Sequence, residues 1–78
     1  AEGKAEAREF IVGRNEKCIG VPLKMLHLKE NVLLSALVPG SKTIIPDGDS
    51  VLEPGDHAVV VSKTGMIKQL GDMIEVDK

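Results

Sequence analysis

The sequence predicts a small α+β domain, built as an antiparallel β-meander with a short crossover helix and a C-terminal helix, that assembles as a dimer. The first observation is the segment 31–38 (NVLLSALV), which is almost entirely apolar and bounded by turn residues, as buried strands are. The second is that its apolar side chains do not alternate with polar ones, so both faces of this strand need cover. A chain of 78 residues has little material for two layers. Domains of this size bury only about 60% of their unfolded surface, so we expect a second copy to supply part of the cover.

Composition restricts the classes of function. The single cysteine, Cys18, excludes an intrachain disulfide, and the four-ligand spacings of zinc sites are missing. The net charge is −2 with both signs interspersed, and Phe10 is the one aromatic residue, so neither a basic stripe nor a base-stacking platform indicates a nucleic-acid partner. No apolar run approaches the roughly 20 residues that span a bilayer, and no signal peptide is evident. A soluble, cytoplasmic setting is expected.

The first part of the chain is predicted to hold a strand, a turn and a short helix. The pattern from Ala5 to Val12 indicates a strand with Phe10 buried, and the polar segment 13–16 (GRNE) indicates a turn. A helix is expected over Pro22–Leu26, because proline is typical of a first helical turn. Leu23 and Leu26, at an i, i+3 spacing, would face inward.

The central strand is expected over Val32–Val38. Strict alternation places Leu34 on one face and Leu37 on the other. Turn residues at 39–41 (PGS) and a second β-branched run, Thr43–Ile45, follow, which indicates a hairpin.

The second part of the chain begins with a dense turn signal at 46–50 (PDGDS), followed by a short strand or bridge at 51–52. Proline and glycine at 54–55 fit the two central positions of a type II turn. The last strand is expected over His57–Val61, and a terminal helix over Lys63–Met73. The inward stripe of that helix comprises Met66, Ile67, Leu70, Met73 and Ile74.

Signals for catalysis or metal binding are poor. His27 and His57 stand apart in the sequence and are expected at a helix end and a strand end. No base is evident beside Cys18, so we interpret this residue as part of the core rather than as a nucleophile. The segment 47–49 (DGD) resembles the start of a calcium loop but lacks its later ligands, which favours a turn. We predict a protein that is not an enzyme and holds no metal.

An ordered set of short motifs resembles one known family. The motifs are IGVPL at 19–23, LHL at 26–28, NVLL at 31–34, IIPDGD at 44–49 and LEPGD at 52–56. In this order they are similar to the TrkA C-terminal domain, also called the RCK C domain, of potassium uptake and potassium channel regulators. The resemblance implies residues 1–6 as a linker remnant, a domain over 7–74 and a tail over 75–78.

The resemblance also implies partners and a role. It implies a homodimer, normally fused behind a Rossmann-like RCK N domain, that docks at the inner face of the plasma membrane on a membrane potassium transport subunit and sets its opening. The expected function is therefore that of a cytoplasmic ligand-sensing and dimerisation domain of a potassium transport system. A purely structural module that tethers an antiporter or other carrier, without binding a small molecule, is the alternative.

In some members of that family the dimer cleft binds cyclic di-AMP. Matching their motif residue by residue implies ligand contacts for cyclic di-AMP, or for another nucleotide, at Leu23, Lys24, Leu28, Lys29, Asn31, Val32 and Pro46. The amide of Asn31 offers both a donor and an acceptor to an adenine edge. Lys29 stands where those members carry arginine, and a lysine lacks the bidentate fork of a guanidinium. An alternative in which Asn31 only caps the strand and Lys29 is solvated stays open.

Overall fold

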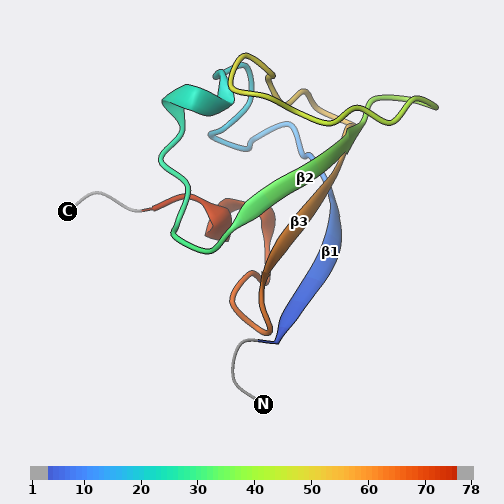
Figure 1. Cartoon of the computed structure of the whole chain (residues 1–78). Helices are drawn as coiled ribbons and strands as arrows, with labels where there is room; N and C mark the ends of the chain where they lie inside the picture. Colours follow the sequence, from blue (N-terminus) through green and yellow to red (C-terminus); the bar gives the residue numbers. More distant parts are fainter. Residues whose placement is uncertain (1–3, 76–78) are drawn as a thin grey trace.

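The computed structural model describes residues 4–75 (Figure 1). In chain order its elements are strand β1 (Ala5–Ile11), the 3-10 turn η1 (Leu23–Met25), strand β2 (Leu33–Val38), strand β3 (His57–Lys63) and the 3-10 turn η2 (Leu70–Met73). The three long strands occupy the predicted positions to within one or two residues. The predicted first helix is confirmed only as the single turn η1, in which Leu23 is half-buried.

The three strands form one antiparallel sheet in the order β1-β3-β2. Ala5 lies opposite Lys63 on one side of β3, and Leu33 lies opposite Val61 on the other. The predicted meander is therefore wrong in its order, because the last strand lies between the first two. A strand that is apolar on both faces, as β3 is around Val59, suits the centre of a sheet.

A β-bulge in β2 overturns the predicted alternation of its side chains. Leu34 pairs with Val60 while Ala36 pairs with Val59, so one extra residue, Ser35, lies between these pairs. Ser35 donates a hydrogen bond from its hydroxyl to the carbonyl oxygen of Val59 at 3.2 Å. The side chains of Leu34 and Leu37 consequently both enter the core, instead of pointing to opposite faces.

The predicted helix over Lys63–Met73 is wrong for most of its length. Lys63 is the last residue of β3, and Met66 N–H donates to its carbonyl oxygen in a turn whose Gly65 has a φ of +80°. A glycine in the left-handed region starts no helix, and only η2 at Leu70–Met73 is helical. Of the expected inward stripe, Ile67, Leu70 and Met73 are buried, whereas Met66 and Ile74 are only half-buried.

The segments between the strands are held by turns. The predicted hairpin after β2 is reduced to a single bridge between Leu37 and Ile44, and Ile45 is 84% exposed. The predicted type II turn at 54–55 fits the structure, since Asp56 N–H donates to the carbonyl oxygen of Glu53 and Gly55 has a φ of +91°. The expected bridge at 51–52 pairs Leu52 with Ile19.

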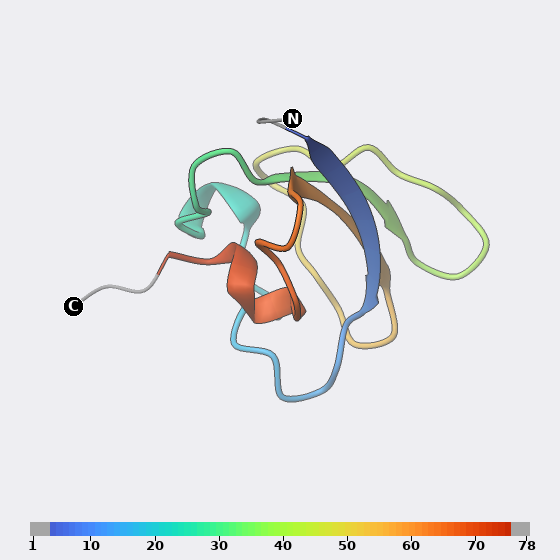
Figure 2. The same ribbon diagram turned by 90° about the horizontal axis from the view of Figure 1, so that it is seen from below.

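Both helical turns lie against the same face of the sheet (Figure 2). The buried core on that side comprises Val12, Cys18, Leu34, Leu37, Leu52, Ala58, Val60, Ile67, Leu70 and Met73, with Phe10 half-buried against it. Arg8 closes the rim of this core, since its guanidinium donates to the carbonyl oxygen of Ile67 at 2.9 Å and lies 5.6 Å from the centre of the Phe10 ring. The opposite, outer face of the sheet carries neither helical turn.

Candidate functional site

The turn η1 is fastened to the 47–50 loop. Leu23 N–H donates to the carbonyl oxygen of Ser50, and Lys24 N–H donates to that of Gly48, both at 2.9 Å. The Lys24 ammonium lies 2.8 Å from a carboxylate oxygen of Asp49. Both side chains are well exposed, so this ion pair adds little stability, but it neutralises the cation that was expected to meet a ligand.

The connection that follows η1 runs beside the C-terminal end of the described chain. Leu28 forms an antiparallel bridge with Ile74, and Lys29 N–H donates to the carbonyl oxygen of Met73 at 2.9 Å. Glu75 N–H donates to the carbonyl oxygen of His27 at 2.6 Å. This pairing fixes the backbone that leads to the start of β2.

Asn31 has an unusual backbone conformation. Its φ is +64°, and its side chain is exposed two residues before β2 begins. Asparagine enters the left-handed region more readily than other residues that carry a side chain, because its short amide can bond locally. The turn into β2 therefore gives Asn31 a structural reason to be asparagine, separate from any ligand.

An open groove of about 640 Å³ lies at this turn. Its lining comprises Lys29, Glu30, Asn31, Met66 and Glu75. One ammonium, two carboxylates, one amide and one thioether therefore meet there. The amide can donate and accept at the edge of a base, while the two carboxylates oppose an anionic group unless further cations join the groove.

The expected contact residues fall into two groups within one chain. Lys29 and Asn31 share the groove, and Leu28 and Val32, both half-buried, flank them along the backbone. Leu23 and Lys24 belong to η1, which is hydrogen-bonded to the loop that follows Pro46. This second group lies at the opposite end of the segment that connects η1 to β2 (Figure 1).

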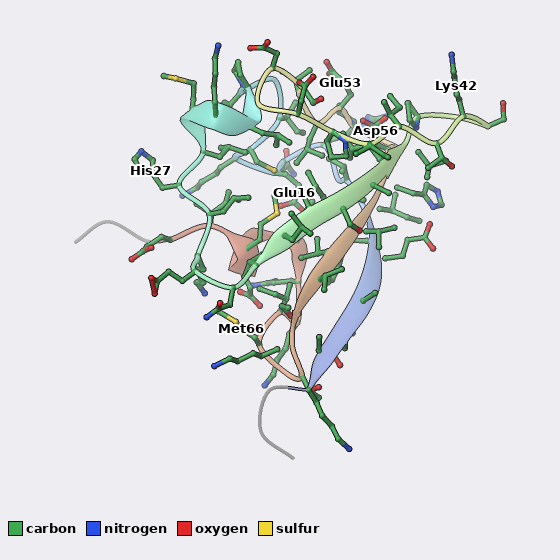
Figure 3. The ribbon with its side chains drawn as sticks, in the orientation of Figure 1. Glu16, His27, Lys42, Glu53, Asp56 and Met66 are labelled. Carbon is green, nitrogen blue, oxygen red and sulfur yellow. The ribbon has the colours of Figure 1, made fainter. Side chains whose placement is uncertain are left out.

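Sequence reasoning missed three of the groove's residues, Glu30, Met66 and Glu75. In Figure 3, Met66 projects near the turn into β2, whereas His27 points away from the sheet. No local pattern places Met66 or Glu75 beside Asn31, because tertiary pairing alone brings these segments together.

The remaining candidates lie apart from this groove, and one of them, His57, has its Nδ1 atom 2.6 Å from a carboxylate oxygen of Glu9. Cys18 is 1% exposed, and burial, assisted by the charge of Glu16, raises the pKa of its thiol, which disfavours the nucleophilic thiolate. Cys18 and Gln69 line a second hollow, of about 420 Å³, beside η2. Asp47 organises the expected turn by accepting a hydrogen bond from Asp49 N–H at 2.9 Å. Among the described residues, no three histidine, cysteine or acidic side chains gather as metal ligands would.

None of the helical segments in the described part of the chain has the length and apolar character needed to cross a bilayer.

Comparisons with known proteins agree on one relationship. The model of the TrkA-C domain family matches residues 7–75. The chain is 34% identical over 70 residues to the Trk system potassium uptake protein trkA homolog 1 of Methanosarcina mazei, covering 90% of this chain and 17% of that protein. It is 35% identical over 68 residues to the Trk system potassium uptake protein TrkA homolog of Archaeoglobus fulgidus, covering 87% of this chain and 16% of that protein.

The fold also has a solved counterpart. A structure described as "Structure of RCK domain with cda" superposes with a TM-score of 0.71 at 20% sequence identity, covering 88% of this chain and 97% of the other. At that identity the likeness concerns the fold. The family model and the sequence relatives confirm the expected resemblance, and the solved structure agrees with it in fold.

Proposed function

This chain belongs to the TrkA-C domain family, and from that premise we propose that it is the regulatory, ligand-sensing domain of a potassium uptake system. The observation that carries the proposal is the match to Trk system potassium uptake proteins over 90% of the chain. The chain spans 17% and 16% of the two relatives described above, so the rest of such a protein would supply further domains. We propose a Rossmann-like RCK N domain and a membrane potassium transport subunit as its partners, on the cytoplasmic side.

The proposed ligand is cyclic di-AMP or another adenine nucleotide, held where the 27–32 connection meets β2. Support comes from the exposed amide of Asn31, from the open groove around it, and from the fold shared with an RCK domain described with cda. The two carboxylates of the groove make one chain a poor anion site by itself. We propose that a second copy completes it, bringing its own residues around Pro46 to the groove.

Ligand control of a transport subunit requires two arrangements of the two copies. A ligand shifts such an equilibrium only by the difference between its affinities for the two arrangements. A site shared by two copies meets this condition directly, because moving one copy against the other changes the number of contacts that the ligand makes.

The backbone of Asn31 permits a sharp test of ligand binding. The variant Asn31→Gly keeps the left-handed conformation at no steric cost and removes the amide, so the fold is retained. Titration calorimetry with cyclic di-AMP, with AMP and ATP for comparison, should show heat for the unaltered chain and at least a tenfold weaker affinity for Asn31→Gly, about 1.4 kcal/mol. The exposed Lys42 lies outside the groove lining, so Lys42→Ala is the matched control and should bind as the unaltered chain does.

A structural tethering module is the second candidate, and two observations favour it. The φ of Asn31 explains this residue without a ligand, and Asp49 already neutralises Lys24. A chain that gives no heat with any of the three nucleotides, at protein concentrations where it is folded, would support tethering and contradict ligand sensing.

A further inference from the structure

The described chain ends in a short segment that lies along the connection between η1 and β2. After η2, Ile74 forms its bridge with Leu28, and Glu75 N–H donates to the carbonyl oxygen of His27 at 2.6 Å. Figure 1 shows this segment in red, where it leaves η2 and passes the connection that leads into β2. We call residues 74–75 the strap, because they run across that connection.

The strap is anchored firmly at its start and weakly along its length. Met73, the residue before it, is fully buried, and its carbonyl oxygen accepts a hydrogen bond from Lys29 N–H at 2.9 Å. Ile74, in contrast, is half-buried, and Glu75 is exposed. Release of the strap beyond Met73 therefore breaks the hydrogen bond to His27 and uncovers part of one apolar side chain, while the core stays closed. Segments with so few buried contacts open locally at a low free energy.

The strap brings a carboxylate into the groove at the turn into β2. Glu75 lines this groove together with Lys29, Glu30 and Asn31. With the strap in place, two carboxylates oppose one ammonium there, whereas without Glu75 the two signs balance. Within residues 4–75 the Glu75 carboxylate forms no ion pair, so the backbone pairing is what places it in the groove.

We propose that the strap is an autoinhibitory element, in which the docked Glu75 and an anionic group of a ligand exclude each other from the groove. This inference rests on the proposed function and names the residue that sets the selectivity of its site. Two negative charges brought together in one groove disfavour each other. A phosphate group that approaches Lys29 is consequently bound more tightly once Glu75 has left.

The exclusion acts in both directions. If release of the strap raises the affinity for an anion by some factor, binding of the anion favours release of the strap by the same factor. A ligand bound beside Asn31 would therefore free residues 74–75 from the connection. The groove thus has an output in the strap that requires no movement of the sheet.

The first experiment tests the charge of Glu75. Inorganic pyrophosphate is the probe, because it offers phosphate groups without a base, and its binding is followed by NMR at the backbone amides of Lys29 and Asn31. Glu75→Gln should bind pyrophosphate about threefold more tightly than the unaltered chain, as expected when one exposed like charge is removed. Glu53→Gln makes the same change of net charge on a loop far from Met66 of the groove (Figure 3), and should bind as the unaltered chain does.

The second experiment tests the backbone of the strap. Glu75→Pro removes the carboxylate and also the N–H that bonds to His27. The preceding residue, Ile74, already has the extended backbone that proline requires before it, with a ψ of 134°. Glu75→Pro should bind pyrophosphate about threefold more tightly than Glu75→Gln, because loss of a backbone hydrogen bond favours release. Adding Lys29→Ala should abolish this gain if pyrophosphate occupies the groove.

Amide hydrogen exchange tests the reverse direction. In the unaltered chain, saturating pyrophosphate should speed exchange of the Glu75 N–H, which is bonded to His27 only while the strap is docked. The amide of Val60, in the centre of the sheet, should exchange at the same rate with and without pyrophosphate. Circular dichroism checks that each variant is folded.

The outcomes separate this inference from the proposed function. Pyrophosphate that binds to none of the variants, or binds Glu75→Gln no more tightly than Glu53→Gln, would overturn autoinhibition by Glu75. Equal affinities of Glu75→Pro and Glu75→Gln, or unchanged exchange of the Glu75 N–H, would overturn release of the strap. Tighter pyrophosphate binding by both Glu75 variants without heat from any nucleotide would support the strap and contradict nucleotide sensing. Nucleotide heat that neither variant alters would overturn the strap and leave nucleotide sensing standing.

Discussion

Leu34 and Leu37 lie three positions apart in β2, yet both side chains enter the same core, with 5% and 3% of their surface exposed. The bulge at Ser35 makes this possible by adding one residue between their pairing partners on β3. The neighbour of Leu34 in the chain, Leu33, points to the outer face instead.

This relationship predicts unequal costs for two adjacent leucines. Leu34→Ala leaves a cavity in the core and should lower the free energy of unfolding by about 2–5 kcal/mol. Leu33→Ala removes a side chain that is 60% exposed in one chain, so the change should be within about 0.5 kcal/mol at concentrations where the chain is monomeric. Urea denaturation measures both, and equal costs would contradict the bulged register.

The two glycines at 55 and 71 should respond oppositely to alanine. Gly55 has a φ of +91°, and forcing a Cβ into the left-handed region costs about 1–2 kcal/mol. Gly71 lies in η2 without a positive φ, and a Cβ there meets no atom within 4 Å. Gly71→Ala should therefore be neutral or stabilising by up to about 1 kcal/mol. Thermal unfolding of the two variants checks this, and a destabilised Gly71→Ala would contradict the helical turn at Leu70–Met73.

Asp72 should make η2 sensitive to acid. Its carboxylate accepts hydrogen bonds from Lys68 N–H at 3.0 Å and Gln69 N–H at 3.1 Å, and these bonds lower the pKa of Asp72. A lowered pKa means that the charged form is preferred in the folded chain. Its contribution to the free energy of unfolding is therefore complete above the ordinary aspartate pKa and disappears as the pH falls through the lowered pKa. The unfolding midpoints of the unaltered chain and Asp72→Asn should differ at neutral pH and converge once the pH falls below the lowered pKa of Asp72. A constant difference across this range would exclude the carboxylate as the cause.

Cys18 should resist thiol reagents in the folded chain. Burial raises the pKa of its thiol and removes it from contact with solvent, so modification by Ellman's reagent should require unfolding. Labelling should be slow in buffer and fast in denaturing urea. Ser41→Cys, which introduces an exposed thiol in the loop after β2, is the control and should label at once. Immediate labelling of Cys18 would contradict its place in the core.

The strands were predictable from local patterns of apolar and β-branched residues bounded by turn residues. The alternation in β1 and the apolar run of β3 each identify a strand without knowledge of its partner. The bulge at Ser35 was not predictable, since an extra residue leaves no mark in hydrophobicity and is defined only against β3. The helix expected after Lys63 failed for a related reason, because an inward spacing of 66, 67, 70 and 73 is also satisfied by an extended segment that ends in one helical turn.

The candidate site was predictable only in part. Family resemblance identified Lys29 and Asn31, which the structure places in one groove, whereas Glu75 joins them through a backbone pairing with His27. The role of Asn31 in a left-handed turn could not be read from its side chain chemistry. Ligand contact therefore stays a prediction for each of the seven residues that the resemblance identified.

The order of the sheet has a consequence for how the chain folds. Both edge strands bond to β3, so the central strand of the sheet is the last of the three to be synthesised. Even the nearest pair of β1 and β3, Ile11 with His57, must close a loop that contains all of β2. The entropy of closing a long loop is lost before the contacts that stabilise the fold can form. Folding is therefore slow, as is typical of topologies rich in non-local contacts. A nascent chain that stops before His57 has no strand to which β1 or β2 can bond, and its core leucines stay open to chaperones and to aggregation.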